Sequence, residues 1–347
     1  DEEKRKKLVI YINPPYAESG STKQKTSKKG VSNETEAHKK FFAKMNTFAK
    51  RELYAQFLMR IYTEIPNCLI ANFSKLKNLQ SPYFSEFQDV FRAKLEKIFL
   101  VPANTFDNVK GEFPIGFFIY NCSKDERFKE IISDVYSANG QFQENKTIFS
   151  FEPPYINDWL RPTWKMMPSN LGFLACNSND FQNQNGVFIE TIKKNQTSTY
   201  FKPIHPSNLI ESCVYYSVRK AIRATWLNDR DQFLSPNENW ATDKEFRSDC
   251  LTFTLFKNDI QSNQGANHWI PFTEQEVNAK EKFESNFMTN FITGKLKPEN
   301  PENETLFGEN ASAKIYDDQP RIFSQEAKEV FDAGRELWKY YHAQKDV

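Results

Sequence analysis

Leu8-Val9-Ile10-Tyr11-Ile12, directly followed by Asn13-Pro14-Pro15-Tyr16, is the segment from which the rest of the chain can be interpreted. Its first five residues are aliphatic or aromatic, which predicts a buried strand. The prolines then stop the strand, because each fixes φ at about −65° and Pro15 bars helical geometry at Pro14. The segment therefore predicts a carboxamide, backbone carbonyls and an aromatic ring held rigidly at the carboxyl end of a strand, where open α/β sheets bind ligands.

Length and charge set loose limits on the class of protein. The chain has 347 residues and a formal net charge of +1, so about two domains are expected and the overall charge favours no partner. Residues 1–60 nevertheless carry a net charge of +7. Part of this charge lies in a Ser/Thr-rich loop that contains Lys23, Lys25, Lys28 and Lys29. These lysines are candidate contacts to a DNA backbone, although such a loop is more often only solvated.

The titratable side chains give no sign of a metal site or of disulfides. Five scattered cysteines without a Cys-x-x-Cys pair predict a reduced, intracellular protein, and the four histidines show no metal-ligand spacing. No apolar run approaches the roughly 18 residues of a membrane span. The sequence therefore predicts a cytoplasmic protein that binds no metal and no membrane.

Glycine is scarce in a way that matters for cofactor binding. The chain has eleven glycines, and no two of them are closer than five residues. There is consequently no Gly-x-Gly, no P-loop and no dinucleotide-binding fingerprint. Any nucleotide-like cofactor must be held by something other than a glycine-rich loop of this chain.

The order of elements predicts an α/β sheet in residues 1–145 and an α+β region in residues 146–347. The expected elements of the first part are strands at 8–12, 68–73, 98–101 and 113–120 and helices at 41–61 and 81–95. Alternating strands and helices imply a largely parallel sheet, and the last two strands imply an antiparallel hairpin at its edge. In the second part we expect helices from Ser207 to Trp226 and after Ser324, and a strand at 251–256.

The motif has a definite chemical capacity. A carboxamide oxygen and a neighbouring carbonyl can both accept from one exocyclic amine, and an aromatic ring can stack on the flat base that carries it. Such a base must leave the double helix, which costs a few kcal/mol. Stacking returns about 1–3 kcal/mol of this cost.

Asn13-Pro14-Pro15-Tyr16 after an apolar strand resembles the catalytic motif of adenine-N6 DNA methyltransferases, in which a helix, a strand, a helix and edge strands follow. The resemblance implies a partial Rossmann-like methyltransferase sheet. It implies that Asn13 and Pro14 hold the N6 amine and that Tyr16 stacks. The segment 113–121 resembles the family's antiparallel strand that lends a second aromatic, for which Phe118 and Tyr120 are candidates. Residues 331–342 are similar to the tail of large bacterial restriction-modification methylases.

Members of that family bind S-adenosylmethionine through a glycine-rich loop, which this sequence lacks. The resemblance therefore implies that this chain is a C-terminal portion, inactive alone, whose cofactor-binding part lies upstream or on a partner subunit. Its expected partner is double-stranded DNA in the bacterial cytoplasm, with residues 146–347 as the target-recognition region. A non-catalytic DNA-recognition module and an RNA or protein methylase remain alternatives. No nuclease motif is recognised.

Overall fold

The computed structural model describes residues 3–4, 7–14, 35–42, 48–107, 109, 111–165, 170–190, 200–257, 269–296 and 319–344. The chain divides into two units. The first comprises residues 1–153, 180–182 and 224–232, and the second comprises residues 154–179, 183–223 and 233–347. The first unit thus extends past residue 145 and includes all of strand β6 (Phe142–Phe149).

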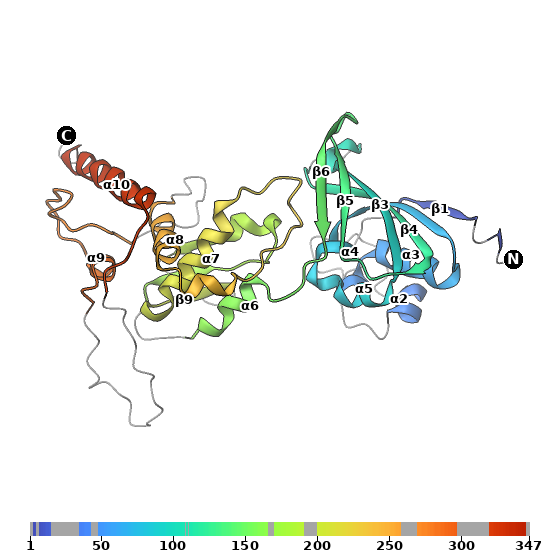
Figure 1. Cartoon of the computed structure of the whole chain (residues 1–347), viewed down its shortest axis with the longest axis horizontal. Coiled ribbons are helices and arrows are strands. Elements are labelled where there is room, and N and C mark those ends of the chain that lie inside the picture. The colour runs from blue at the N-terminus through green and yellow to red at the C-terminus, as the bar shows by residue number, and fades with distance from the viewer. Residues whose placement is uncertain are drawn as a thin grey trace, which may run out of the picture. The chain divides into compact units, whose positions relative to one another are not determined.

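A six-stranded mixed sheet forms the first unit (Figure 1). Its strand order is β1-β2-β4-β3-β5-β6. β1 pairs with β2 in parallel and β3 pairs with β5 in parallel, whereas the β2–β4, β3–β4 and β5–β6 pairs are antiparallel. The bounds of the other five strands are β1 (Val9–Ile12), β2 (Leu69–Lys75), β3 (Ala93–Pro102), β4 (Pro114–Asp125) and β5 (Glu130–Tyr136).

Helices cover one face of this sheet (Figure 1). They are α2 (Glu36–Phe41), α3 (Leu53–Glu64), α4 (Lys77–Gln80) and α5 (Ser85–Val90). Their buried side chains, such as Leu58 and Phe87, pack with alternate strand residues such as Ile70 and Phe118 in one core. Because side chains alternate across a strand, the intervening residues face the other side of the sheet. A second, aromatic-rich cluster lies there around Val101 and Ile115.

The predicted antiparallel hairpin is present, but it does not lie at the edge of the sheet. β4 lies between β2 and β3, and β3 pairs further with β5 at Phe99 and Leu100. The prediction of an edge was wrong because β5 and β6 were not recognised as strands. β6 is exposed along most of its length and carries five consecutive polar residues, 143–147, so it lacks the apolar pattern from which strands are predicted.

Two predicted helices of the first unit also differ from the structure. The helix expected over 41–61 consists of α2, a 3-10 turn (Phe48–Arg51) and α3, and residues 43–47 lie outside the described part. The helix expected over 81–95 ends at Val90, because Leu95 belongs to β3. Ser81 does begin this region, since its hydroxyl accepts from the backbone N–H of Tyr83 in a 3-10 turn (Pro82–Phe84).

The second unit combines helices with a small antiparallel sheet of order β8-β7-β9. Its helices are α6 (Ile156–Leu160), α7 (Leu209–Ala221), α8 (Lys244–Phe256), α9 (Phe287–Ile292) and α10 (Gln325–Gln344), and its strands are β7 (Gly172–Ala175), β8 (Phe188–Glu190) and β9 (Phe201–Ile204). The 3-10 turns of the second unit are Arg161–Thr163, Pro206–Asn208 and Glu238–Ala241, and a further turn, Phe181–Gly186, begins in the first unit.

Two expectations for the second unit were wrong. Residues 251–256 belong to helix α8, which begins seven residues earlier because Asp243 caps it by accepting from the N–H of Phe246 at 2.9 Å. Helix α7 ends at Ala221 rather than Trp226. Its preceding turn is capped by His205, and Ser207 contacts the ring of His205 instead. The cap of α10 is confirmed, since Ser324 accepts from the N–H of Ala327.

The cysteines are all free thiols, and we expect them to react slowly. Burial raises the pKa of Cys250 to about 11 and that of Cys176 to about 12. At pH 7 only about one such thiol in ten thousand or fewer is then ionised, and the thiolate is the reactive form. Alkylation of the native protein at pH 7 should therefore leave both cysteines unmodified, while unfolding should restore normal rates. If mass spectrometry showed rapid alkylation of Cys176 in the native protein, the burial of this residue would be contradicted.

Candidate functional site

The predicted motif, residues 13–16, begins directly after the last residue of β1, Ile12. The parallel register places Ile12 level with Asn72 of β2. The next two residues follow at the carboxyl end of the strand: Asn13 is exposed and Pro14 is buried. The ring of Pro14 fixes the backbone φ at this position, directly after an exposed asparagine. Pro15 and Tyr16, and the loop lysines Lys23, Lys25, Lys28 and Lys29, lie outside the described residues.

Phe118 and Tyr120, the expected base-stacking residues, lie in the core under the helices. Their rings are 0% and 2% exposed and stack on each other with a centroid distance of 5.8 Å. Asn78 donates from its side-chain nitrogen to the Tyr120 hydroxyl at 2.7 Å. Burial raises the pKa of this phenol well above its ordinary value. Neither ring can meet a base without opening the core, so this part of the prediction is corrected.

Phe117 is the aromatic residue of β4 that faces the other side of the sheet. The antiparallel register places it opposite Phe73, one position beyond the level of Ile12. Its ring lies 4.8 Å from Phe73, 5.1 Å from Phe99 and 6.3 Å from Tyr11, measured between centroids. The sequence missed Phe117 because β4 is apolar on both faces, so alternation alone could not say which face is covered by helices.

A group of buried polar side chains lies at the carboxyl end of β2. Asn72 and Ser74 are each 0% exposed and share the helix-covered face. The Asn72 side-chain oxygen and the Ser74 hydroxyl have no hydrogen-bond partner. Burying such atoms unpaired is costly. Beside them in sequence, Lys77 forms a 2.6 Å ion pair with Glu52, whose side chain is 5% exposed. This group was not predicted, because residues 68–73 have the apolar pattern of an ordinary strand.

The residues present do not make a complete site for a nucleotide-like methyl donor. The sequence has no Gly-x-Gly, and β1 has a neighbouring strand on one side only within the described part of the chain. Asn13 thus follows the strand that lies at the outer boundary of the described sheet. Among the described residues there is also no group of three or more His, Cys, Asp or Glu arranged for a metal ion.

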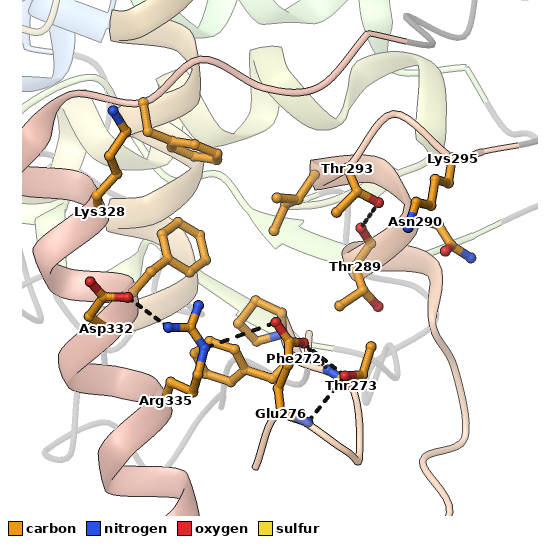
Figure 2. A pocket seen from close by; sticks show the side chains of 14 residues that line it. Phe272, Thr273, Glu276, Thr289, Asn290, Thr293, Lys295, Lys328, Asp332 and Arg335 are labelled. Atoms are coloured by element: carbon orange, nitrogen blue, oxygen red, sulfur yellow. Dashed lines mark hydrogen bonds and ion pairs between the residues drawn. The ribbon is translucent and has the colours of Figure 1, made fainter.

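A separate pocket of about 490 Å³ lies in the second unit between α9 and α10 (Figure 2). Arg335 of α10 forms a 2.6 Å ion pair with Asp332 and approaches Glu276 at 4.0 Å. Its guanidinium lies 5.5 Å from the centre of the Phe272 ring. Glu276 in turn accepts from the backbone N–H of Thr273 at 2.7 Å. Asp332 and Arg335 both lie on α10, whereas Glu276 and Phe272 precede α9 in sequence. Because Arg335 contacts both of these residues, we interpret the pocket as a junction that anchors α10.

Gly334→Ala should weaken the packing of α10 on α8. A Cβ at this position would collide with the ring of Phe256 on α8. Helix propensity alone would favour alanine by about 1 kcal/mol, but overpacking typically costs about 1–3 kcal/mol, and we expect the collision to dominate. Thermal or urea unfolding measures the change, with the exposed Glu329→Ala as a matched control expected within about 0.5 kcal/mol of the parent. A stabilised Gly334→Ala protein would contradict the packing of α10 on α8.

Within the described residues, no helix combines the length and apolarity that a membrane crossing needs.

No protein-family model and no curated protein matches this chain. Among solved structures, the type IIL restriction-modification enzyme MmeI in complex with DNA is similar over 51% of this chain and 24% of its own, at 15% identity and a TM-score of 0.29. The DrdV–DNA complex matches 50% of this chain and 20% of its own, at 16% identity and a TM-score of 0.29. A protein described as a modification subunit of a type I restriction enzyme from Vibrio vulnificus matches 57% and 36%, at 14% identity and a TM-score of 0.25.

The first and third of these are described as a restriction-modification enzyme and a restriction-enzyme modification subunit, and the matched part is 20–36% of the three chains. TM-scores of 0.29 and below do not define a shared fold. The function of this chain must therefore be argued from its own residues.

Proposed function

We propose that this chain is the part of a DNA methyltransferase that holds the acceptor base, with adenine N6 as the methylated atom. The observation that carries the proposal is the position of Asn13-Pro14, an exposed asparagine followed by a buried proline, at the carboxyl end of an apolar strand. The mixed sheet behind it, with an antiparallel strand next to β2, supports the same assignment. S-adenosylmethionine would be bound by an upstream segment or a partner subunit, called here the donor-binding half.

Asn13 and Pro14 would act by orienting the amine rather than by proton transfer. The Asn13 side-chain oxygen and the Pro14 carbonyl would each accept one N–H of the adenine amino group. Two acceptors on the same nitrogen favour a pyramidal geometry in which the lone pair points away from both of them. Preorganised acceptors of this kind need no reorganisation during the reaction. No general base would be required before the attack: the lone pair would form the N–C bond as the methyl–sulfur bond of the donor breaks, and the surplus proton on N6 would then leave to solvent.

Aromatic rings would hold the flipped base between them. Tyr16 is the proposed first ring. For the second ring we propose Phe117 in place of Phe118 and Tyr120, because Phe117 lies on the face away from the core helices and next to the level of Asn13. Stacking of this kind contributes about 1–3 kcal/mol per base. The basic loop at residues 23–29 would contact phosphates of the duplex, residues 146–347 would read the target, and the setting would be the bacterial cytoplasm.

The proposal is tested by an acceptor panel. The protein is combined with its donor-binding half and a radiolabelled methyl donor, and is offered duplex DNA, RNA and peptide. Label should appear as N6-methyladenine in DNA, and DNA in which N6-methyladenine already fills the target should take up no further label. Transfer of label to RNA or peptide instead of DNA would contradict adenine N6 of DNA as the acceptor. The protein could instead bind DNA sequence-specifically but transfer no methyl group even with the donor-binding half present. That result would identify the chain as a DNA-recognition module.

A further inference from the structure

A second, smaller pocket lies in the second unit beside the start of α8. Its volume is about 160 Å³, and its walls are the first residues of α8 and the segment before α10. Three of its seven described lining residues, Lys244, Arg247 and Arg321, are cationic, and none of the seven is Asp or Glu. In the larger pocket, by contrast, Arg335 pairs with Asp332. The smaller pocket, called here the basic pocket, therefore concentrates positive charge without a carboxylate among its described lining residues.

The two cationic side chains of α8 keep their charge available. Lys244 is exposed, and its side chain forms no ion pair within the described part of the chain. Arg247 donates from Nη1 to the carbonyl of Ala241 at 3.1 Å, and its guanidinium lies 5.9 Å from the centre of the Trp240 ring. The Nε of Arg247 is buried and has no hydrogen-bond partner. Because an unpaired buried donor on a charged group is costly, this Nε needs an acceptor from a ligand.

Carboxylates near the basic pocket are engaged elsewhere. Asp243 caps α8, and Asp249 accepts from the backbone N–H of Ser324 at 3.1 Å. Burial raises the pKa of Glu211 on α7, against the opposing charge of Arg247, so this carboxyl is a poor counter-ion for the guanidinium. The positive charge of the pocket is therefore left for a ligand to neutralise.

The segment 319–322, which forms the other wall, is held in place on both sides. The backbone N–H of Arg321 donates to the carbonyl of Ile292 in α9 at 2.9 Å. The guanidinium of Arg321 lies 4.2 Å from the centre of the Phe291 ring. These contacts fix the segment to α9, as the Asp249 carboxylate fixes its continuation to α8. The cationic groups are thus positioned before a ligand arrives, which reduces the ordering that binding requires.

From this charge, size and rigidity we infer that the basic pocket binds a phosphate group. A pocket of about 160 Å³ has room for the five heavy atoms of a phosphate, since a water takes up roughly 30 Å³ in the liquid. Guanidinium groups bind phosphate oxygens through parallel N–H donors, and a lysine adds a point charge. A carboxylate would bring one negative charge to three cations, whereas a phosphate brings about two. The inference does not rest on the proposed function, because no residue of the methyl-transfer site enters it.

Titration calorimetry with inorganic phosphate tests the inference on the whole chain, with sodium chloride of equal ionic strength as the blank. Saturable binding is expected with a Kd below about 1 mM. Lys244→Gln should weaken this binding about 10- to 100-fold, the usual effect of losing one charge-assisted hydrogen bond. Because Lys244 is exposed, the substitution should not disturb folding. Absence of saturable binding in this range, or unchanged affinity in Lys244→Gln, would overturn the inference.

Lys257→Gln is the matched control, because it removes the same charge just beyond the other end of α8. The helix has 13 residues, so the two lysines lie about 20 Å apart along its axis. This exceeds the Debye length of about 8 Å at physiological ionic strength, and phosphate affinity should be unchanged in Lys257→Gln. Equal losses in the two variants would show an effect of net charge alone and would overturn the inference.

Chemical modification of arginines locates the bound phosphate. Phenylglyoxal should modify Arg247 and Arg321 more slowly when inorganic phosphate is present, as measured by mass spectrometry of the digested protein. Arg161, which is exposed in the same unit, should react at the same rate with and without phosphate. If phosphate protected all three arginines equally, or none of them, the basic pocket would not be the binding site.

The phosphate group could belong to a DNA backbone or to a free phosphorylated compound, and binding of duplex DNA distinguishes these sources. With a DNA backbone as the source, Lys244→Gln should weaken duplex binding and reduce the slope of log K against log salt by about 0.9, the share of one phosphate contact. With a free compound as the source, duplex affinity should stay at the parent value while affinity for inorganic phosphate falls. Either result supports the phosphate pocket. Asn13→Ala should leave phosphate binding unchanged whatever its effect on methyl transfer, so the two proposals can fail separately.

Discussion

Replacing Asn13 by alanine in the assembled protein is expected to lower kcat for methyl transfer about 100- to 1,000-fold, the usual effect of deleting one preorganised polar contact at a reacting group. The side chain is exposed at the end of β1, so its loss should not disturb the fold. Affinity for duplex DNA should change little, because phosphate contacts dominate it. Single-turnover transfer with saturating donor measures the effect separately from product release.

A second substitution at the same position sharpens this prediction. Asn13→Asp keeps an oxygen acceptor in nearly the same place but adds a charge, so it should retain more activity than alanine. Base flipping can be followed by the fluorescence of 2-aminopurine at the target, and it should persist in both variants if Tyr16 and Phe117 hold the ring. Equal kcat values for Asn13→Ala and the parent would remove Asn13 from the reaction.

Phe118→Ala is expected to destabilise the first unit by about 3–5 kcal/mol, the usual cost of emptying a buried aromatic site. The ring is 0% exposed and stacks with Tyr120. Phe117→Ala should cost less stability, because its ring lies at the partly covered surface of the sheet, but it should weaken retention of the flipped base. Urea unfolding followed by near-ultraviolet circular dichroism measures the first effect, and 2-aminopurine fluorescence measures the second.

The pair of variants distinguishes two roles for β4. If Phe118→Ala had nearly the stability of the parent but lost retention of the flipped base, Phe118 would be a base-stacking residue, as the sequence predicted, and not a core residue. If Phe117→Ala bound the flipped base normally, the aromatic cluster around Phe73 and Phe99 would be packing only. Each variant serves as the control for the other, since both remove the same side chain from adjacent residues of one strand.

The sequence predicted the parts of this fold that depend on local pattern. The strands at 8–12 and near 69 and the hairpin of β3 and β4 were found because their apolar side chains identify them without knowledge of distant partners. The predicted burial of residues 8–12 was wrong, since Val9 and Tyr11 are 58% and 64% exposed. Two features of the first unit were missed because they depend on residues far away in the sequence. β6 is a strand because β5 pairs with it, and Phe117 differs from Phe118 only through the helices that cover one face.

The candidate site was predictable to the same extent. The chemistry proposed for Asn13 rests on its residue type and the prolines after it, and this residue lies at a strand end. The buried Asn72 and Ser74 were not predictable, since nothing in the sequence says that polar residues at the end of β2 turn inward. Residues 251–256 failed for a local reason: a short apolar run fits either a strand or a helix, and the cap at Asp243 lies eight residues before it.

The insertion of β4 between β2 and β3 has a consequence for how the chain folds. Of the six strands, β1 comes first in sequence, β2 begins only at Leu69, and β4 follows β3 although it lies between β2 and β3. Such non-local pairing makes folding slow and leaves apolar strands uncovered in the meantime. The end of β1 that carries Asn13 therefore gains its aromatic neighbours only after β4 has inserted between two strands that precede it in sequence.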